Sequence, residues 1–264
     1  MKANTHFVRF RDFACGVTAP LTCAALLGSA ALSQATLLWS DNFNNYSDGS
    51  LAHQTGGGAG TPGWGPNNWF AVGGGGTVNV TTGVVNGNGD IRHGLDATFS
   101  ATVGSTGTIW ISFDWGHDSS HSNTYGGLSL FDGDNSTERV LIGNTYDPAN
   151  WNMNGAPTDT GVSNIGMKTG VARITLNLGA ANDVIDLWVA ATGSPVDVSG
   201  APMATTSNRD LANVSIIRIM GNNDQKFDNL KIGTTMLDVA AIPEPSAALL
   251  GGLGMLALLR RRRA

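Results

Sequence analysis

The chain has 264 residues, including 36 glycines; 41% of its residues are hydrophobic, 13% are charged, and the formal net charge is −5. The hydrophobic share is enough for a core and excludes wholesale disorder, while glycine at about twice its usual frequency disfavours long helices. Between residues 36 and 245 there are eight basic and nineteen acidic residues. Because nucleic-acid binding depends on basic surfaces, we expect no nucleic-acid partner.

The first 35 residues have the three-part order of a secretory signal peptide. A basic stretch precedes an apolar run that extends to Leu32, and Ser33-Gln34-Ala35 then supplies the small residues of a cleavage site. We predict a signal helix within 1–35 and cleavage after Ala35; the alternative is a buried N-terminal helix. Both cysteines, Cys15 and Cys23, lie in this segment. The mature chain would therefore contain no thiol for a disulfide or a zinc site.

From residue 36 to residue 242 the sequence is typical of short strands joined by turns. Several stretches alternate apolar and polar residues, which is the period of a strand with one buried face. The expected strands are 36–43, 68–72, 77–81, 84–86, 94–101, 108–115, 127–131, 139–142, 171–178, 184–190, 214–220 and 226–232. Asn, Asp and Gly gather at 86–90, 132–135 and 221–224, where we expect turns.

About twelve short strands without a helix predict an all-β, two-sheet antiparallel sandwich of jelly-roll type, in one domain over 36–242. Five stretches resemble parts of concanavalin A-like (laminin G-like) jelly rolls in secreted bacterial proteins. They are Trp39-Ser40-Asp41-Asn42-Phe43, Tyr46-Ser47-Asp48-Gly49-Ser50-Leu51, Trp110-Ile111-Ser112-Phe113, Gly127-Leu128-Ser129-Leu130-Phe131 and, at the closing strand, Phe227-Asp228-Asn229-Leu230-Lys231-Ile232-Gly233. The resemblance implies an extracellular module of that fold.

Five aromatic residues lie in or near loops rich in Asn and Gly, where they could stack on sugar rings. These candidate glycan-binding residues are Trp64, Trp69, Trp115, Tyr125 and Trp151. The alternative is that these residues close the ends of the sandwich. The other tryptophans, Trp39, Trp110 and Trp188, alternate within strands, and we expect them in the core.

Glycoside hydrolysis, which jelly-roll glucanases carry out, needs two carboxylates roughly 5 to 10 Å apart. The chain has only two glutamates, Glu138 and Glu244, and no Glu-x-Asp-x-Glu pattern. An aspartate pair could replace them, and Asp114 and Asp118 flank Trp115 at the end of an expected strand. A carbohydrate-active hydrolase that uses Asp carboxylates is therefore an alternative to a non-catalytic module, and we assign no catalytic residue.

Calcium is the one candidate ion. Asp132, Asp134 and Ser136 offer oxygen ligands at alternating positions of a tight turn, although the Gly and the final Glu of an EF-hand loop are missing. The alternative is an Asp/Asn/Gly turn between two strands, because these residues are the ordinary turn formers.

The last 22 residues have an equally ordered pattern. Pro243 and Pro245 prevent a helix from extending upstream. Residues 246–259 carry no charge and are shorter than the roughly 20 residues needed to cross a bilayer core. Arg260, Arg261, Arg262 and Arg263 follow, as a cytoplasmic stop signal would. The alternative, a terminal core helix, would have to bury four consecutive arginines.

Pro243-Glu244-Pro245, a short apolar transmembrane segment and an arginine cluster resemble the PEP-CTERM sorting signal of Gram-negative bacteria. The resemblance implies recognition by an exosortase, a membrane cysteine protease-transpeptidase. It also implies that the precursor is held at the inner membrane before the body reaches the cell surface or extracellular matrix. With this fold, we expect a non-catalytic module whose partner is exopolysaccharide or another matrix glycan; a purely structural matrix protein is a further alternative.

Overall fold

The structure is a computed structural model, and it describes residues 36–52, 54, 59–60, 69–71, 78–95, 97–118, 125–134, 136–145, 150–154, 156, 159–177, 179 and 181–240. The chain divides into the units Met1–Gln34 and Ala35–Ala264, and every described residue belongs to the second. The predicted signal segment and the sorting tail both lie outside the described residues. Within the described part, no helix has the length and apolar character needed to span a membrane.

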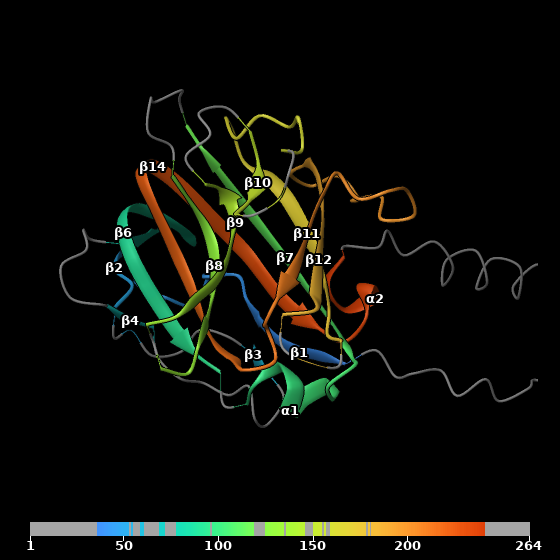
Figure 1. The fold of residues 1–264 in the computed structure, drawn as a ribbon. Helices are drawn as coiled ribbons and strands as arrows, with labels where there is room; N and C mark the ends of the chain where they lie inside the picture. The colour runs from blue at the N-terminus through green and yellow to red at the C-terminus, as the bar shows by residue number, and fades with distance from the viewer. Residues whose placement is uncertain are drawn as a thin grey trace, which may run out of the picture. The chain divides into compact units, whose positions relative to one another are not determined.

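Strands dominate the described residues (Figure 1). They are β1 (Leu37–Asp41), β2 (Gly49–Ser50), β3 (Ala59–Gly60), β4 (Phe70–Ala71), β5 (Val78–Thr81), β6 (Val84–Gly94), β7 (Thr108–His117), β8 (Gly126–Asp132), β9 (Glu138–Asn144), β10 (Asn152–Met153), β11 (Lys168–Thr175), β12 (Asp183–Ala191), β13 (Ala204–Arg209) and β14 (Val214–Gly233). The two short helices are α1 (Phe99–Val103) and α2 (Met236–Val239).

Strand β14 belongs to both sheets of the sandwich. Its first part pairs with β8 and β6, and beyond β8 follow β9 and β10. Its second part pairs with β7 and β1, and beyond β7 follow β11, β12 and β13. All pairs of named strands are antiparallel. The prediction of an all-β, two-sheet antiparallel sandwich is confirmed.

Two of the expected turns are wrong. Residues 86–90 lie inside β6 and residues 221–224 inside β14, where the two strands pair with a register shift between Gly221 and Gln225. A Cβ on Gly221 would lie 1.9 Å from the Gln225 side chain, so the glycine permits a close approach there. In many sequences, glycines of this kind mark a turn. In this protein, they let β14 bend as it passes from one sheet to the other. The turn expected at 132–135 lies between β8 and β9; residues 133–134 form a turn, and residue 135 is outside the described residues.

The strand expected over 94–101 is also wrong, because β6 ends at Gly94, the first residue of that range, and α1 begins at Phe99. The Thr98 side chain accepts a hydrogen bond from the Ala101 amide at 3.2 Å, and the Phe99 ring is buried. Helix α2 begins at a capping box in which the Thr235 and Asp238 groups bond each other. These caps stabilise helices too short to show a period in the sequence.

Strand β7 shows how the core is formed. Ile109, Ile111, Phe113 and Trp115 point into the sandwich and are fully buried. The intervening residues lie on the opposite, outward face, which carries a second apolar cluster of Val171, Trp188, Val196 and Val239. The chain after β12 and helix α2 supply the last two of these residues. Both therefore cover part of the outward face of this sheet.

Candidate functional site

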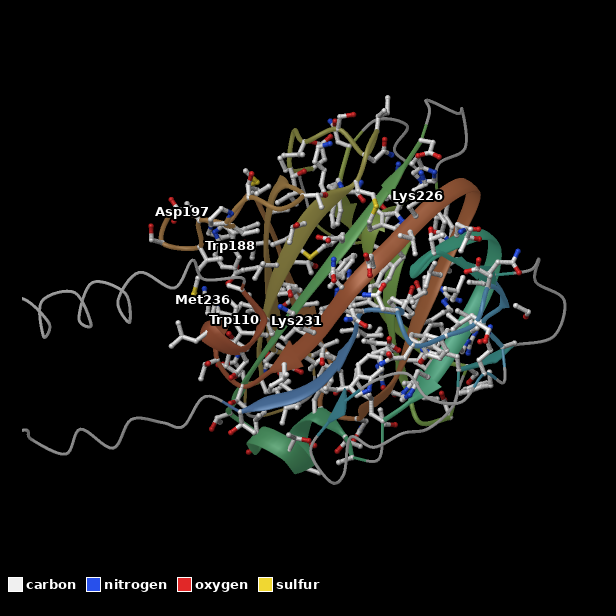
Figure 2. The ribbon with its side chains drawn as sticks, turned by 180° about the vertical axis from the view of Figure 1, so that it is seen from behind. Trp110, Trp188, Asp197, Lys226, Lys231 and Met236 are labelled. Carbon is white, nitrogen blue, oxygen red and sulfur yellow. The ribbon has the colours of Figure 1, made fainter. Side chains whose placement is uncertain are left out.

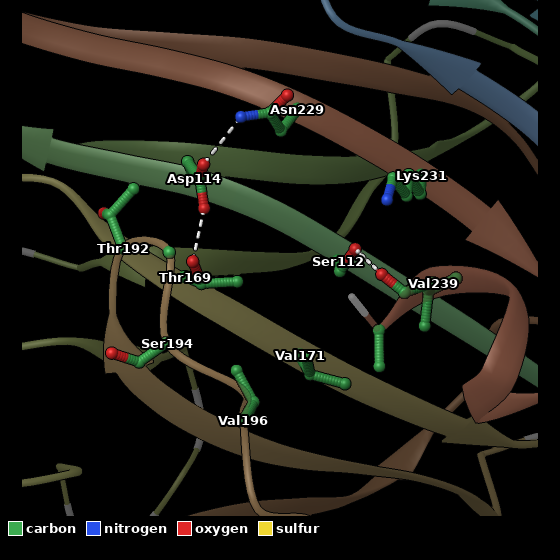
Figure 3. Close-up of a pocket in the computed structure, with 12 residues that line it drawn as sticks. Ser112, Asp114, Thr169, Val171, Thr192, Ser194, Val196, Asn229, Lys231 and Val239 are labelled. Carbon is green, nitrogen blue, oxygen red and sulfur yellow. Dashed lines mark hydrogen bonds between the residues drawn. The ribbon is translucent and has the colours of Figure 1, made fainter. Parts of the chain in front are cut away.

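A pocket of about 290 Å³ opens on the outward face of β7, β11 and β14 (Figure 3). The segment after β12 forms one wall, and the end of α2 forms another. The residues that line it are Ser112, Asp114, Thr169, Val171, Thr192, Gly193, Ser194, Val196, Asn229, Lys231, Val239 and Ala240. A few convergent polar groups against apolar walls are typical of small-molecule sites, and the volume lies near the lower end of their usual range, about 300–1,000 Å³.

Strand alternation and one bulge bring the polar groups together. Ser112 and Asp114 are outward residues of β7, and Thr169 of β11 lies directly opposite Asp114. On the other side, three residue steps of β14 from Asp228 to Lys231 face only two steps of β7. The extra residue is accommodated by Asn229, whose φ of 51° is in the left-handed region that Asn tolerates better than most residues.

Asp114 is the centre of this arrangement. Its carboxylate accepts a hydrogen bond from Thr169 Oγ1 at 2.5 Å on one oxygen and from Asn229 Nδ2 at 2.8 Å on the other (Figure 3). Only 5% of the residue is exposed. Each carboxylate oxygen has a second lone pair, so a ligand that donates hydrogen bonds, such as a hydroxylated one, can bind there.

A second carboxyl group lies beside Asp114. Asp228 is its direct neighbour on β14. Burial raises the pKa of Asp228 to about 6, and the nearby charges of Asp114 and Asp41 act in the same direction. The backbone amide of Asn229 opposes the shift by donating to Asp228 Oδ1 at 2.7 Å. Near neutral pH, Asp228 can therefore exchange a proton, which few surface aspartates do.

Of the candidate stacking residues, the structure places Trp69, Trp115 and Trp151 in the core, fully buried. The indole nitrogens of Trp69 and Trp115 donate to Asp41 and Gln225, both at 3.1 Å. The prediction that these three stack on sugars is therefore wrong. Polar neighbours in sequence suggested loops, but Trp115 has the same inward alternation as Phe113. Tyr125 is partly buried, and Trp64 lies outside the described residues.

The tryptophans expected in the core divide between the two faces. Trp39 is fully buried in the main core. Trp188 instead belongs to the second apolar cluster on the outward face, and Trp110 stacks against it with ring centroids 6.1 Å apart (Figure 2). The Arg173 guanidinium lies within 6 Å of both ring centroids and pairs with Asp186 at 2.6 Å. This packing holds β7, β11 and β12 together next to the pocket.

The sequence paired Asp114 with Asp118, but the structure does not bring them together. Asp118 follows the end of β7 and pairs with Lys226 at 2.8 Å, with its side chain 55% exposed. Four residues along an extended chain span about 13 Å. That separation exceeds the carboxylate spacing of inverting glycosidases, roughly 6.5–9.5 Å. The carboxyl group beside Asp114 is Asp228, which the sequence could not indicate because it lies 114 positions away.

The candidate calcium ligands are hydrogen-bonded within their turn. Asp134 accepts bonds from the Ser136 and Thr137 amides and the Thr137 hydroxyl, and these bonds lower its pKa. Asp132 forms an ion pair with Arg139. Within the described ranges, no cluster of three or more His, Cys, Asp or Glu side chains could hold a metal ion. The contacts are those of a structural turn, and calcium binding stays a prediction.

No protein-family model matches this chain, and no curated protein sequence does. Among solved structures, domain 4 of the extracellular arabinanase AbnA from Geobacillus stearothermophilus, in complex with arabinotriose, is similar over 79% of this chain and 95% of its own, with 15% identity and a TM-score of 0.44. The catalytic domain of a glycoside hydrolase family 131 protein from Coprinopsis cinerea is similar over 65% and 71%, with 14% identity and a TM-score of 0.34.

The binding domain of botulinum neurotoxin serotype C1 is similar over 75% of this chain, with 13% identity and a TM-score of 0.37. The chain spans 48% of that neurotoxin domain's length. Identities and scores this low leave the chemistry of the pocket to be argued from the residues of this chain.

Proposed function

We propose that this protein is an exported interaction module that binds a saccharide of the cell surface or extracellular matrix in the pocket around Asp114. The observation that carries the proposal is the buried Asp114 carboxylate, held from both sides by Thr169 and Asn229 at the wall of a cavity. Pre-positioned acceptors and donors of this kind suit sugar hydroxyls, because the polar groups do not have to be ordered on binding.

Export and sorting are the second part of the proposal. Their support is the sequence of the two ends: the signal peptide with Ala35 at its cleavage site, and the PEP-CTERM-like tail that begins at Pro243. An exosortase would hold the precursor transiently at the inner membrane of a Gram-negative bacterium and then release the body. Replacing Arg260–Arg263 with glutamine tests this step: the unprocessed precursor should accumulate, or lose its membrane association, whereas unchanged processing and surface delivery would contradict it.

The saccharide proposal is tested with a panel of matrix polysaccharides and the full-length chain, in parallel with two matched variants. Asp114→Asn removes the negative charge of the pocket, while its side chain can still bond Thr169 and Asn229. We expect it to weaken binding about tenfold, because hydrogen bonds to a charged group contribute roughly 1.5–3 kcal/mol. Asp118→Asn makes the same chemical change on the exposed end of β7 and should leave affinity unchanged. Absence of binding across the panel would favour a purely structural matrix protein.

A second candidate function, glycoside hydrolysis, is favoured by one observation. Burial raises the pKa of Asp228 to about 6, and Asp228 lies directly opposite Asp114, so two carboxyl groups are neighbours and one of them, Asp228, can carry a proton near that pH. Such a pair is the requirement for acid–base cleavage of a glycosidic bond. Release of reducing ends by the full-length chain, abolished by Asp228→Asn as well as by Asp114→Asn, would establish hydrolysis and replace the binding-only function.

A further inference from the structure

Lys231 is the unusual residue of the pocket. Eight basic residues lie between positions 36 and 240, and all belong to the part of the chain that the structure describes. Among these described residues, Lys231 is the one whose side chain makes neither an ion pair nor a hydrogen bond. The other seven, which do, are Arg92, Arg139, Lys168, Arg173, Arg209, Arg218 and Lys226.

An unpaired ammonium is unexpected in a body with more than twice as many acidic as basic residues. Asp114 lines the same pocket, yet it does not pair with Lys231, because its oxygens are directed to Thr169 and Asn229. Ser112, which lies directly opposite Lys231, donates its hydroxyl to the Val239 carbonyl at 2.7 Å. The Lys231 charge is therefore available to a ligand in the pocket.

The two charges of the pocket lie at opposite ends of its floor. Lys231 is at the level of Ser112, and Asp114 is two residues further along β7, which is about 7 Å along the backbone of the strand. Figure 3 shows Lys231 and Asp114 on the same face of the sheet, with Ser112 between them in the view. A ligand that contacts both ends must donate hydrogen bonds to Asp114 and present a negative charge to Lys231. The two positions are about one sugar ring apart.

We propose that the pocket selects an acidic sugar, a uronate residue of a polysaccharide, whose carboxylate pairs with Lys231 while its ring hydroxyls donate to Asp114. The reverse orientation would place two carboxylates together at Asp114, so the charges also fix the direction in which the ring enters. Val171, Val196 and Val239 supply the apolar wall for the ring's C–H face. This inference rests on the proposed saccharide binding and specifies the class of sugar.

The test compares oligogalacturonates and oligomannuronates with neutral hexose oligomers of the same length, titrated into the full-length chain. We expect the uronates to bind more tightly than the neutral oligomers. Lys231→Met should weaken uronate binding about tenfold, which is the range for the loss of a charge-assisted hydrogen bond. The matched control is Lys226→Met, which makes the same change on the same strand. Lys226 lies well away from Lys231 along β14 in Figure 2 and pairs with Asp118 outside the pocket. This control should bind as the unaltered chain does.

The outcomes separate this inference from the function on which it rests. Equal or tighter binding of neutral oligomers, or loss of uronate binding in both lysine variants, overturns the selection of uronate and leaves saccharide binding in place. Acetate binding as tightly as the uronates would overturn the role of the hydroxyls at Asp114. If neither class of oligomer binds, the proposed function and the inference fail together.

Discussion

Replacing Asp228 with asparagine should stabilise the folded protein at neutral pH. In the fold the pKa of this carboxyl rises from 3.8 to about 6, so the folded state holds the proton more tightly than the unfolded chain does. Stability from this group is complete below pH 3.8 and is lost as the pH rises to about 6. Above that pH, the ionised group lies against the Asp114 and Asp41 charges.

The size of the effect follows from the shift. Two pKa units correspond to about 3 kcal/mol at 1.36 kcal/mol per unit, but Asp228 is partly exposed, and solvent screening reduces the gain to about 1–2 kcal/mol. Asparagine can still accept the hydrogen bond from the Asn229 amide, so that contact is preserved. Urea unfolding of both proteins should therefore show a higher midpoint for Asp228→Asn at pH 7.5 and no difference near pH 3.5.

The control has the opposite sign. Asp197 lies in an exposed loop, where the hydroxyl and amide of Ser199 lower its pKa. Asp197→Asn should therefore reduce stability at pH 7.5 and leave it unchanged at low pH. A gain for Asp228→Asn that is the same at both pH values, or no gain at pH 7.5, would refute the raised pKa of the carboxyl group beside Asp114.

Four further outcomes follow from the packing. Gly170→Ala should lower the unfolding free energy by about 1–3 kcal/mol, measured in urea, because its Cβ would lie 2.5 Å from the Trp151 ring. Trp115→Ala should cost about 3–5 kcal/mol, as for a large core residue, without changing saccharide affinity in the molecules that fold. Truncation after residue 242 should leave the thermal unfolding midpoint unchanged, since the described core ends at Val239. Asp134→Ala should lower that midpoint equally in calcium and in a chelator, because the carboxylate serves the turn; a larger loss in calcium would instead support a calcium site.

Alternation in the sequence predicted most of β7 but only part of the other pocket strands: the strand expected over 171–178 begins after Thr169 of β11, and β14 was expected as two strands joined by a turn. It could not predict which face of β7 is the main core, because Trp110 and Trp115 give tryptophans to both faces. The choice of face depends on the chain after β12 and on α2, because both cover the outward face of β7. Helix α2 has only four residues, which are too few to show a helical period in the sequence. Local sequence therefore determined the strand but not its environment.

The site itself was only half predictable. Asp114 was a candidate because it lies near the end of an expected strand, next to Trp115, but the groups that define its chemistry are distant in sequence. Thr169 is 55 positions away and Asn229 is 115. A bulge in β14, with Asn229 in a left-handed conformation, brings that amide to the carboxylate. In the sequence, Asp228-Asn229 is an ordinary Asp-Asn dipeptide. Only the hydrogen-bonded register of β14 with β7 shows that it lies next to Asp114.

Binding of a saccharide at Asp114 is best tested by amide chemical shifts measured during a titration with oligouronate. The shifts should change at Asp114, Thr169, Asn229 and Lys231, whereas those of the far sheet, such as Ser129 and Arg218, should not move. Shifts centred on the far sheet, or none at saturating oligouronate and neutral oligosaccharide alike, would contradict it.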